Sequence, residues 1–329
     1  MRLPDARGTL SRAVFAGMAT PSGRGVDPFL ATQAAGEVDV LRSDDLQITL
    51  WTLYELHYRG FDEVPDEREW DPDLLRLRRY LEGVFEADLR RRVTTPAVDD
   101  DDFPAQLRDV IESAEGPSLA AHLHRRADRE QFLVFLRQRS LYHLKESDPH
   151  TFVLPRVGGR AKVALAELLY DEFGSGRPDA LHSTLYADAL VGAGLDPTYG
   201  AYVDETPAST LAVNNLMSLF GLHRRLRGSA LGHLAAFETT SSVPCRKIAA
   251  GIERVGLPGV VAAYFHEHVE ADAVHEQVAL RDICGSLVAD EPHLADDVLF
   301  GAAACLALDA VAAEDLLSSW TDPASVAAS

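Results

Sequence analysis

Residues 161–182 read AKVALAELLYDEFGSGRPDALH, and this stretch predicts two helices joined by a short turn. The leucines of the first helix, Leu165 and Leu168 among them, fall on one face, because residues three and four apart share a face of an α-helix. One turn further along this face lies Glu172, a carboxylate. A Gly-x-Gly turn and a proline follow, and His182 stands just inside the start of the second helix. Two consecutive helices therefore direct a carboxylate and an imidazole toward the same interior.

The bulk composition excludes several classes of function. The chain has 329 residues, a formal net charge of −20 and a pI near 4.9. Nonspecific binding of nucleic acid needs a surplus of Lys and Arg, so a nucleic-acid partner is not expected. The same repulsion disfavours anionic membranes. Only three cysteines are present and none forms a C-x-x-C pair, which argues against a cysteine-based zinc or iron–sulfur site.

The sequence also lacks the signals of export and membrane insertion. No segment approaches the roughly 20 consecutive apolar residues of a membrane-spanning helix. The first 25 residues contain scattered arginines but no continuous apolar stretch of the kind found in signal peptides. We therefore expect a soluble, cytoplasmic protein without a membrane partner.

Helical periodicity dominates the rest of the chain. Apolar residues recur at three- and four-residue spacing, and Gly, Pro and Asp separate the periodic segments. One predicted helix starts behind Ser43, a good capping residue, and ends at Gly60. The best alternating segment, residues 150–157, contains Pro155 and is interpreted as a loop. The pattern therefore predicts an all-α bundle.

Three regions follow from this pattern. Residues 1–25 are predicted to be a flexible tail. Residues 26–120 are predicted to form an N-terminal helical extension that packs on the core. Residues 121–329 are predicted to form the main helical domain.

A long predicted helix opens at Gly259 and carries unusual residues on its apolar face. His268, Asp272 and His275 share that face with aromatic and aliphatic residues. The first two are neighbours at i and i+4 and can bind one metal ion together, and the third follows one turn later. Burying an Asp is costly, so a partner must compensate its charge. In the helix that contains ALGHLAAFE, Glu238 likewise extends an apolar stripe by one turn.

Six residues from four predicted helices thus point inward: Glu172, His182, Glu238, His268, Asp272 and His275. Carboxylates and imidazoles from facing helices are the ligands of non-haem di-iron sites. A buried ion-pair network would give the same periodicity, and the spacing alone does not separate the two. No Glu lies three residues before any of the 12 histidines, so the paired Glu-x-x-His motifs of ferritin-like bundles are absent. The His-Glu-x-x-His motif of zinc proteases is absent too.

Two motifs carry a family resemblance. EFGSGRPDALH places a His ten residues after a Glu that precedes Phe-Gly-x-Gly, and YFHEHVEADAVH contains His-x-x-x-Asp-x-x-His beside an aromatic pair. Glu238 stands at the expected end of a helix between the motifs, and Glu146 closes the first core helix upstream. Over residues 125–290 the chain resembles the haem-oxygenase-like di-iron oxidases and oxygenases, also described as iron-containing redox enzymes. Its N-terminal extension resembles that of many actinobacterial members.

The resemblance implies a haem-oxygenase-like helical bundle and a set of seven iron ligands: Glu146, Glu172, His182, Glu238, His268, Asp272 and His275. It implies one iron on Glu146, His182 and His275, and a second on Glu172, His268 and Asp272, with Glu238 bridging or close by. Asp171 is a candidate for orienting one ligand. Helical phase adds five candidates for the substrate pocket: Tyr142, Tyr186, Asn215, Phe237 and Tyr264.

By the same resemblance, two Fe(II)/Fe(III) ions would use O2 as co-substrate to oxidise a small amine, an amino acid or a fatty acid. N-oxygenation, desaturation and oxidative C–C cleavage are the implied outcomes. The partners would be a small-molecule substrate, an electron donor and a second copy of the chain in a homodimer. Two alternatives remain at this stage. One is a haem-binding or haem-degrading enzyme on the same fold, which the inward carboxylates oppose. The other is a non-enzymatic binding protein whose core is an ion-pair network, which predicts inward Lys or Arg.

Overall fold

A computed structural model describes residues 1–19, 39–98 and 101–321, with the backbone alone for residues 270–274. The described residues form α-helices and short helical turns, with no strand among them, which confirms the all-α prediction. The α-helices, in chain order, are α1 (Thr9–Met18), α3 (Asp44–Glu55), α4 (Pro72–Arg92), α5 (Phe103–Glu112), α6 (Leu119–Arg125), α7 (Arg129–His143), α8 (Asp148–Thr151), α9 (Gly159–Glu172), α10 (His182–Ala193), α11 (Ala208–Leu222), α12 (Arg227–Arg254), α13 (Gly259–Gln277), α14 (Ser286–Asp290) and α15 (Ala295–Thr321). A π-helical segment, Val278–Gly285, joins α13 to α14.

Polar residues at the helix starts explain several of the boundaries. The Ser43 side chain accepts a hydrogen bond from the backbone of Leu46 and caps α3, as its position in the sequence predicts. Asp71 and Asp102 cap α4 and α5 in the same way, and a proline opens each helix. Asp128 begins α7 with a reciprocal capping box. These local signals fix where the helices start.

The segment predicted to be a loop between α7 and α9 contains two short helical turns. They are α8 and the 3₁₀ turn Leu154–Arg156. Both turns are brief, and they allow the chain to reverse before α9.

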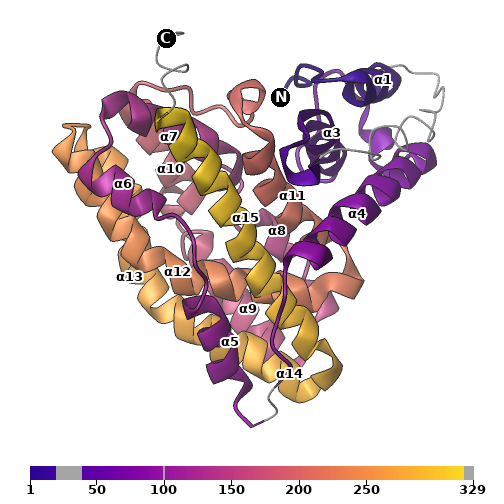
Figure 1. Ribbon diagram of the computed structural model, residues 1–329, viewed down its shortest axis with the longest axis vertical. Helices are drawn as coiled ribbons and strands as arrows, with labels where there is room; N and C mark the ends of the chain where they lie inside the picture. The colour runs from indigo at the N-terminus through magenta and orange to yellow at the C-terminus, as the bar shows by residue number, and fades with distance from the viewer. Residues whose placement is uncertain (20–38, 99–100, 322–329) are drawn as a thin grey trace.

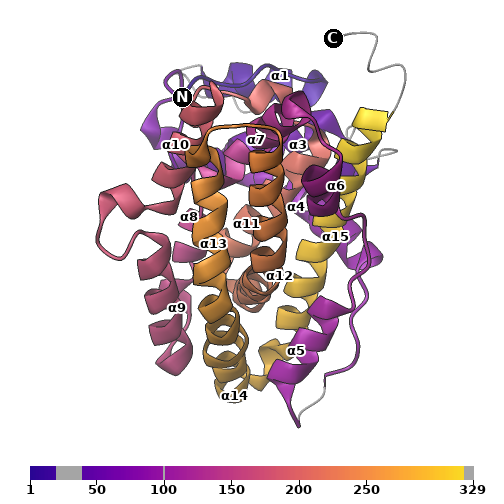
Figure 2. The same cartoon turned by 90° about the vertical axis from the view of Figure 1, so that its left-hand side faces the viewer.

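Helix α12 lies at the centre of the bundle, between α13 and α15 (Figure 2). Glycines allow α12 and α15 to approach backbone to backbone. A Cβ atom added to Gly232 would overlap the carbonyl of Val298, and one added to Gly301 would overlap the carbonyl of Ser229. Because the two glycines lie on opposite helices, the contact depends on both of them.

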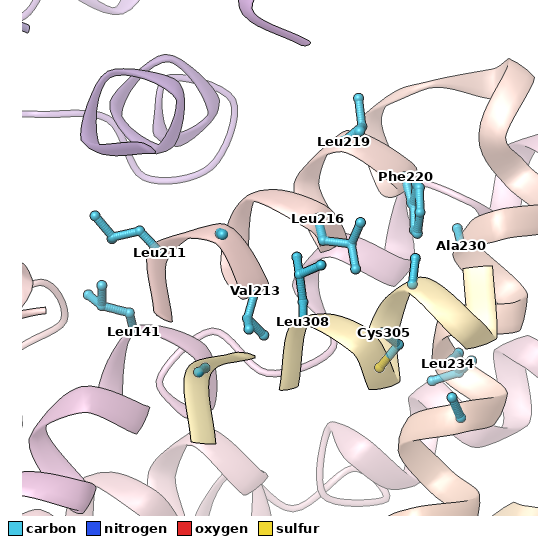
Figure 3. Close-up of a cluster of buried hydrophobic side chains, with 14 of the residues drawn as sticks. Leu141, Leu211, Val213, Leu216, Leu219, Phe220, Ala230, Leu234, Cys305 and Leu308 are labelled. Atoms are coloured by element: carbon cyan, nitrogen blue, oxygen red, sulfur yellow. The ribbon is translucent and has the colours of Figure 1, made fainter. Parts of the chain in front are cut away.

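The other face of α15 packs on α11 and completes the apolar core. Leu216 and Phe220 of α11 meet Leu308 and Cys305 of α15 in a cluster of buried side chains (Figure 3). Nearly every residue of α11 is buried, including its polar ones. A helix that is buried on all sides must have neighbours all round. Helices α3, α12 and α15 provide them.

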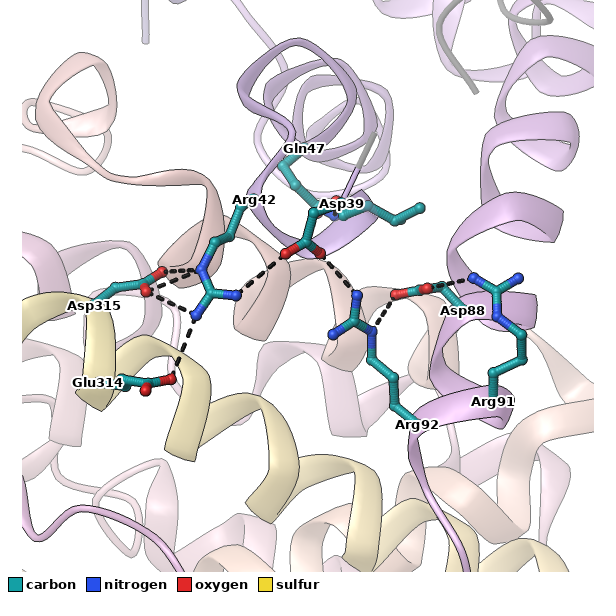
Figure 4. Close-up of polar contacts among 9 residues, drawn as sticks. Asp39, Arg42, Gln47, Asp88, Arg91, Arg92, Glu314 and Asp315 are labelled. Carbon is teal, nitrogen blue, oxygen red and sulfur yellow. Dashed lines mark hydrogen bonds and ion pairs between the residues drawn. The ribbon is translucent and has the colours of Figure 1, made fainter. Parts of the chain in front are cut away.

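The N-terminal helices α1, α3 and α4 form a layer at one side of the bundle (Figure 1). A chain of ion pairs joins this layer to α15 (Figure 4). Arg42 contacts Asp39 at 3.2 Å and Asp315 at 2.9 Å, and Arg92 contacts Asp39 at 2.8 Å and Asp88 at 2.7 Å. Exposed pairs of this kind contribute at most about 1 kcal/mol each, so they fix the position of the layer more than they stabilise it.

Two of the predicted regions need correction. Residues 9–18 form α1, whose Leu10, Val14 and Met18 are buried against the core, so this part of the predicted flexible tail is ordered helix. The apolar i, i+4 spacing in this segment signals that burial. Residues 20–38 lie outside the described residues. The boundary predicted at residue 120 falls inside α6, which packs on α12, and α5 packs on α15, so both helices belong to the core.

None of the helices in the described part of the chain combines the length and the apolar character needed to cross a membrane.

Two histidine side chains are buried close to each other in the core. His150 of α8 and His233 of α12 have ring centroids 5.6 Å apart, and His233 also stacks on Phe237. Neither ring nitrogen of His233 has a hydrogen-bond partner in the described part of the chain. Burial lowers the pKa of His150 to about 4 and holds the pKa of His233 well below its usual value. Both rings are therefore neutral in the folded protein at neutral pH.

The close approach of α12 and α15 can be tested with a matched pair of variants. We expect Gly232→Ala to lower the free energy of unfolding by about 2–3 kcal/mol, because the new methyl group forces the helices apart. Gly83→Ala in α4 meets no atom within 4 Å. It should stabilise the protein by about 0.5–1 kcal/mol through helix propensity. Urea unfolding followed by circular dichroism measures both values. Equal effects of the two variants would contradict the proposed contact.

The buried histidines predict a loss of stability in acid. The unfolded chain takes up a proton on His233 near pH 6.5, whereas the folded protein does not, so the free energy of unfolding falls as the pH drops below 6.5. Between pH 7.5 and 5.5 this loss is about 1.4 kcal/mol for one such group. In His233→Leu the total loss over that range should be smaller by this amount. Parallel pH profiles for the two proteins would mean that folded His233 takes up the proton as readily as the unfolded chain does.

Candidate metal centre

The turn between α9 and α10 brings Glu172 and His182 together, as residues 161–182 predict. Glu172 is the last residue of α9 and His182 is the first of α10, and both are buried. The chain reverses through three residues with positive φ, at 79° for Gly174, 52° for Ser175 and 82° for Gly176. Glycine adopts this conformation without strain, which explains the Gly-x-Gly spacing. The Nδ1 atom of His182 lies 3.0 Å from a carboxylate oxygen of Glu172.

Glu146 reaches the same interior from a turn rather than from a helix. Helix α7 ends at His143, so Glu146 lies three residues beyond the helix that the resemblance expects it to close. The next residue, Ser147, has a positive φ of 66°, which is uncommon outside glycine. Its hydroxyl donates a hydrogen bond to Glu172 at 3.1 Å. The turn therefore holds Glu146 and Glu172 side by side.

A buried ion pair anchors this turn to the N-terminal layer. The Lys145 ammonium lies 3.3 Å from Glu55 of α3, and the Tyr199 hydroxyl donates to the same carboxylate at 2.6 Å. Both charged side chains are almost fully buried. Removing one partner of such a pair leaves a buried charge uncompensated, so the contact fixes the path of the chain. Lys145 thus points away from the cluster around Glu146.

Helix α13 contributes two imidazoles, His268 and His275, about two turns apart. His268 Nδ1 lies 2.8 Å from the backbone carbonyl of Tyr264. Because a carbonyl only accepts, Nδ1 carries a proton, and Nε2 lies 3.5 Å from a carboxylate oxygen of Glu146. His275 Nδ1 lies 3.5 Å from both Glu172 and Glu238. The side chain of Asp272 lies outside the described residues, so its role as a ligand stays a prediction.

Glu238 lies in the middle of α12, which continues to Arg254. The resemblance places a Glu at the end of a helix here, and that detail is wrong. The sequence could not show the continuation, because Pro244 falls within the helix and proline ordinarily ends one. The inward direction predicted for Glu238 is confirmed, since its side chain is buried beside His275.

The ligand atoms form two overlapping groups. In each group one atom per residue lies within 4.8 Å of the atoms of the others. The first group is Glu146, Glu172, His182 and His268, and the second is Glu172, Glu238 and His275. This grouping differs from the one implied by resemblance, which put His275 with Glu146 and had Glu238 bridging the two irons or close by. Glu172 is the residue common to both groups.

The charges in the cluster depend on one another. Burial works to raise the pKa of Glu146, but His268 and His143 stabilise its anion, so that the net shift is downward. Burial works to lower the pKa of His182, but the nearby carboxylate of Glu172 outweighs it and the net shift is upward. Glu146 is therefore held as an anion, and an anion buried there needs positive charge beside it.

The residues fit a metal ion. Nδ1 of buried His182 lies close to Glu172 yet makes no hydrogen bond in the described part of the chain. The nitrogen and the carboxylate oxygen are close together but are not aligned for a hydrogen bond with each other. Two ligand atoms that bind the same metal ion have this arrangement. Imidazole and carboxylate together suit iron, and no cysteine is in either group.

Several neighbouring residues were not identified from the sequence as parts of the centre. The Tyr264 hydroxyl lies 2.8 and 2.9 Å from the two oxygens of Glu146 and 2.6 Å from Nδ1 of His143. His143 stands three residues before Glu146, and that spacing is the one signal that could have found it.

Asp171, predicted to orient a ligand, has a carboxylate oxygen 3.5 Å from Nε2 of His275.

A cavity of about 400 Å³ leads to the cluster and reaches Glu146 and His268. Phe237 and Tyr264 line it, as the helical phase predicts. Tyr142 and Tyr186 do not line this cavity. Tyr142 packs on Phe237 and His143, and Tyr186 packs on His143 and Tyr264.

The pocket prediction for Asn215 is wrong. Its amide donates two hydrogen bonds to Gln47 of α3, on another side of α11. Helical periodicity gives the direction of a side chain about its own helix axis, but it does not say which other helix lies in that direction.

Comparison with known proteins gives a consistent result. Residues 133–310 match the family described as iron-containing redox enzyme. A nitrosourea synthase of Streptomyces achromogenes subsp. streptozoticus is 27% identical over 213 residues, or 64% of this chain. The chain spans 45% of the length of that relative.

Solved structures show the same fold. A CADD-like protein of unknown function from Nostoc punctiforme has a TM-score of 0.52 and 18% identity, over 66% of this chain and 96% of that one. A second crystal structure of that protein gives a TM-score of 0.50. The family match covers more than half of the chain and includes each residue of both ligand groups. The chain therefore belongs to the iron-containing redox enzyme family and has the haem-oxygenase-like helical fold.

Proposed function

We propose that the protein is a non-haem di-iron enzyme that uses O2 to oxidise a small organic substrate. The observation that carries this proposal is the position of Glu172, whose carboxylate belongs to both buried ligand groups. A carboxylate has two oxygens and can bind one ion with each. The relative named nitrosourea synthase supports the proposal, since a nitrosourea contains a nitrogen–oxygen bond. N-oxygenation, desaturation and oxidative C–C cleavage are the outcomes that we consider.

In this proposal Glu146, His182 and His268 hold one iron, Glu238 and His275 hold the other, and Glu172 bridges them. Asp272 is proposed as a further ligand of the second iron, because it lies three residues before His275 on the same helix face. Iron bound there would supply the capacity to reduce O2 and oxidise the substrate. The protein contributes the geometry and a shielded interior.

The surrounding side chains have separable roles. Tyr264 and His143 hold Glu146 in place through hydrogen bonds. Ser147 holds Glu172. Phe237 and Phe265 line the cavity beside the cluster and limit the access of water. Asp171 is proposed to orient His275 from its outer nitrogen.

The two alternatives are less well supported. An ion-pair core would place Lys or Arg in the cluster, and the nearest buried lysine, Lys145, is directed to Glu55 instead. A haem would need an apolar slot beside an axial histidine, whereas the described cluster contains three buried carboxylates.

The bridging role of Glu172 predicts a difference in iron stoichiometry between variants. The wild-type protein should bind two ferrous ions per chain in an anaerobic titration. Glu172→Ala should lose both, and Glu238→Ala should lose one, because it removes a ligand from the second group alone. The affinity for iron at the altered site should fall by about ten- to a hundredfold or more. Mössbauer spectroscopy counts the ions and, after exposure to O2, reports whether the two ferric ions are antiferromagnetically coupled.

Glu267→Ala is the matched control, because Glu267 is exposed and adjacent to His268. It should bind two ions. Circular dichroism should show unaltered helix content in all three variants. Retention of two ions by Glu172→Ala, or the absence of specific iron uptake by the wild-type protein, would refute the di-iron proposal.

A further inference from the structure

The cavity that reaches the metal centre has a charged end as well as an apolar one. Arg139 of α7 and Asp309 of α15 both line it, with their charged groups 3.5 Å apart. Each side chain is about three-quarters to two-thirds buried, at 24% and 32% exposure. No other ion pair of the described chain has both of its members on the wall of this cavity and away from the proposed ligands.

The pair is loosely made. Its hydrogen bond is long, at 3.5 Å, and the guanidinium of Arg139 has five N–H donors in all. The ring of Phe135 lies 6.0 Å from the guanidinium carbon. Because Arg139 and Asp309 interact weakly with each other, each can instead pair with the opposite charge of a zwitterionic ligand. The carboxylate of such a ligand suits the planar fork of Arg139, and an ammonium suits Asp309.

The rest of the wall is mainly apolar. Phe135, Phe237, Phe265, Ile248 and Leu306 line the cavity, and Glu115 is a further charged residue on its wall. Pro244 also lines it and has no N–H to donate within α12. The apolar part of this surface favours a hydrocarbon or aromatic group.

Helix geometry separates the two ends. Arg139 lies four residues before His143, which places their Cα atoms about 6 Å apart along α7. Glu146 is three residues further on, in the following turn. A ligand with its charged groups at Arg139 therefore reaches the cluster only with a side chain of several atoms.

We propose that the cavity binds a free α-amino acid with an apolar side chain, whose carboxylate pairs with Arg139, whose ammonium pairs with Asp309, and whose side chain extends toward Glu146 and His268. This inference rests on the proposed function, because the di-iron proposal places iron at the cluster that the side chain of the amino acid approaches. The α-amino group is held away from the cluster. An amine would leave Arg139 without a new partner, and a fatty acid would leave Asp309 without one.

The test is a binding titration by calorimetry on the iron-free protein. The probes are L-leucine, L-methionine, L-phenylalanine and L-tryptophan. For each, the analogue without the amino group and the analogue without the carboxylate are measured beside it, together with octanoate. We expect at least one amino acid to bind at least tenfold more tightly than both of its analogues.

Variants then assign each charge. Arg139→Gln should weaken binding of that amino acid by about ten- to a hundredfold and leave the decarboxylated analogue unaffected. Asp309→Asn should weaken the amino acid to a similar extent and leave the deaminated analogue unaffected. Arg137→Gln is the control, since Arg137 pairs with Glu205 and does not line the cavity.

Three results would overturn the inference. Tighter binding of octanoate or of the deaminated analogues would identify a fatty-acid pocket, and tighter binding of the amines would identify an amine pocket. Equal binding of each amino acid and its analogues, or no binding of any probe, would show that Arg139 and Asp309 do not select a zwitterionic ligand. Because the titration contains no iron, a protein that selects the amino acid but takes up no iron refutes the di-iron proposal alone.

Discussion

Burying a carboxylate in a helical core costs several kcal/mol unless positive charge or hydrogen-bond donors lie within reach. This protein buries Glu146, Glu172 and Glu238 at one point, together with three imidazoles. The neighbouring histidines, tyrosine and serine compensate part of that cost in the described residues. A pair of divalent cations would compensate the rest. In the di-iron proposal, the surrounding helices have to hold the geometry of these side chains.

The helices do this through contacts some distance from the cluster. Gly232 and Gly301 let α12 and α15 meet backbone to backbone. This contact fixes where α12, the helix that carries Glu238, lies in the bundle. The buried pair between Lys145 and Glu55 anchors the turn that carries Glu146. The N-terminal layer thereby supports a candidate ligand of the core, although it contributes no residue of its own to the described cluster.

The cavity joins this centre to the part of the molecule that would recognise a substrate. One wall comes from α7, which carries Arg139 and ends just before Glu146, and another from α12, which carries Phe237 and Glu238. In the two proposals, the same helices would determine both substrate recognition and reactivity. A change in the substrate can be accommodated at Arg139 and Asp309 without altering the ligands, since these residues belong to neither ligand group.

The all-α class, the cap at Ser43 and the inward direction of Glu172, His182 and Glu238 could be predicted from the sequence, because helical periodicity and capping are local properties of the chain. The family motifs added Glu146, whose own periodicity was uninformative because it lies in a turn. Other features depended on how the helices pack. The partition of ligands into two groups, the shared role of Glu172, the contact of Tyr264 with Glu146 and the burial of α1 each join segments distant in sequence. Periodicity gives the direction of a side chain about its own helix axis, whereas the residue that it meets is decided by the packing of that helix against its neighbours.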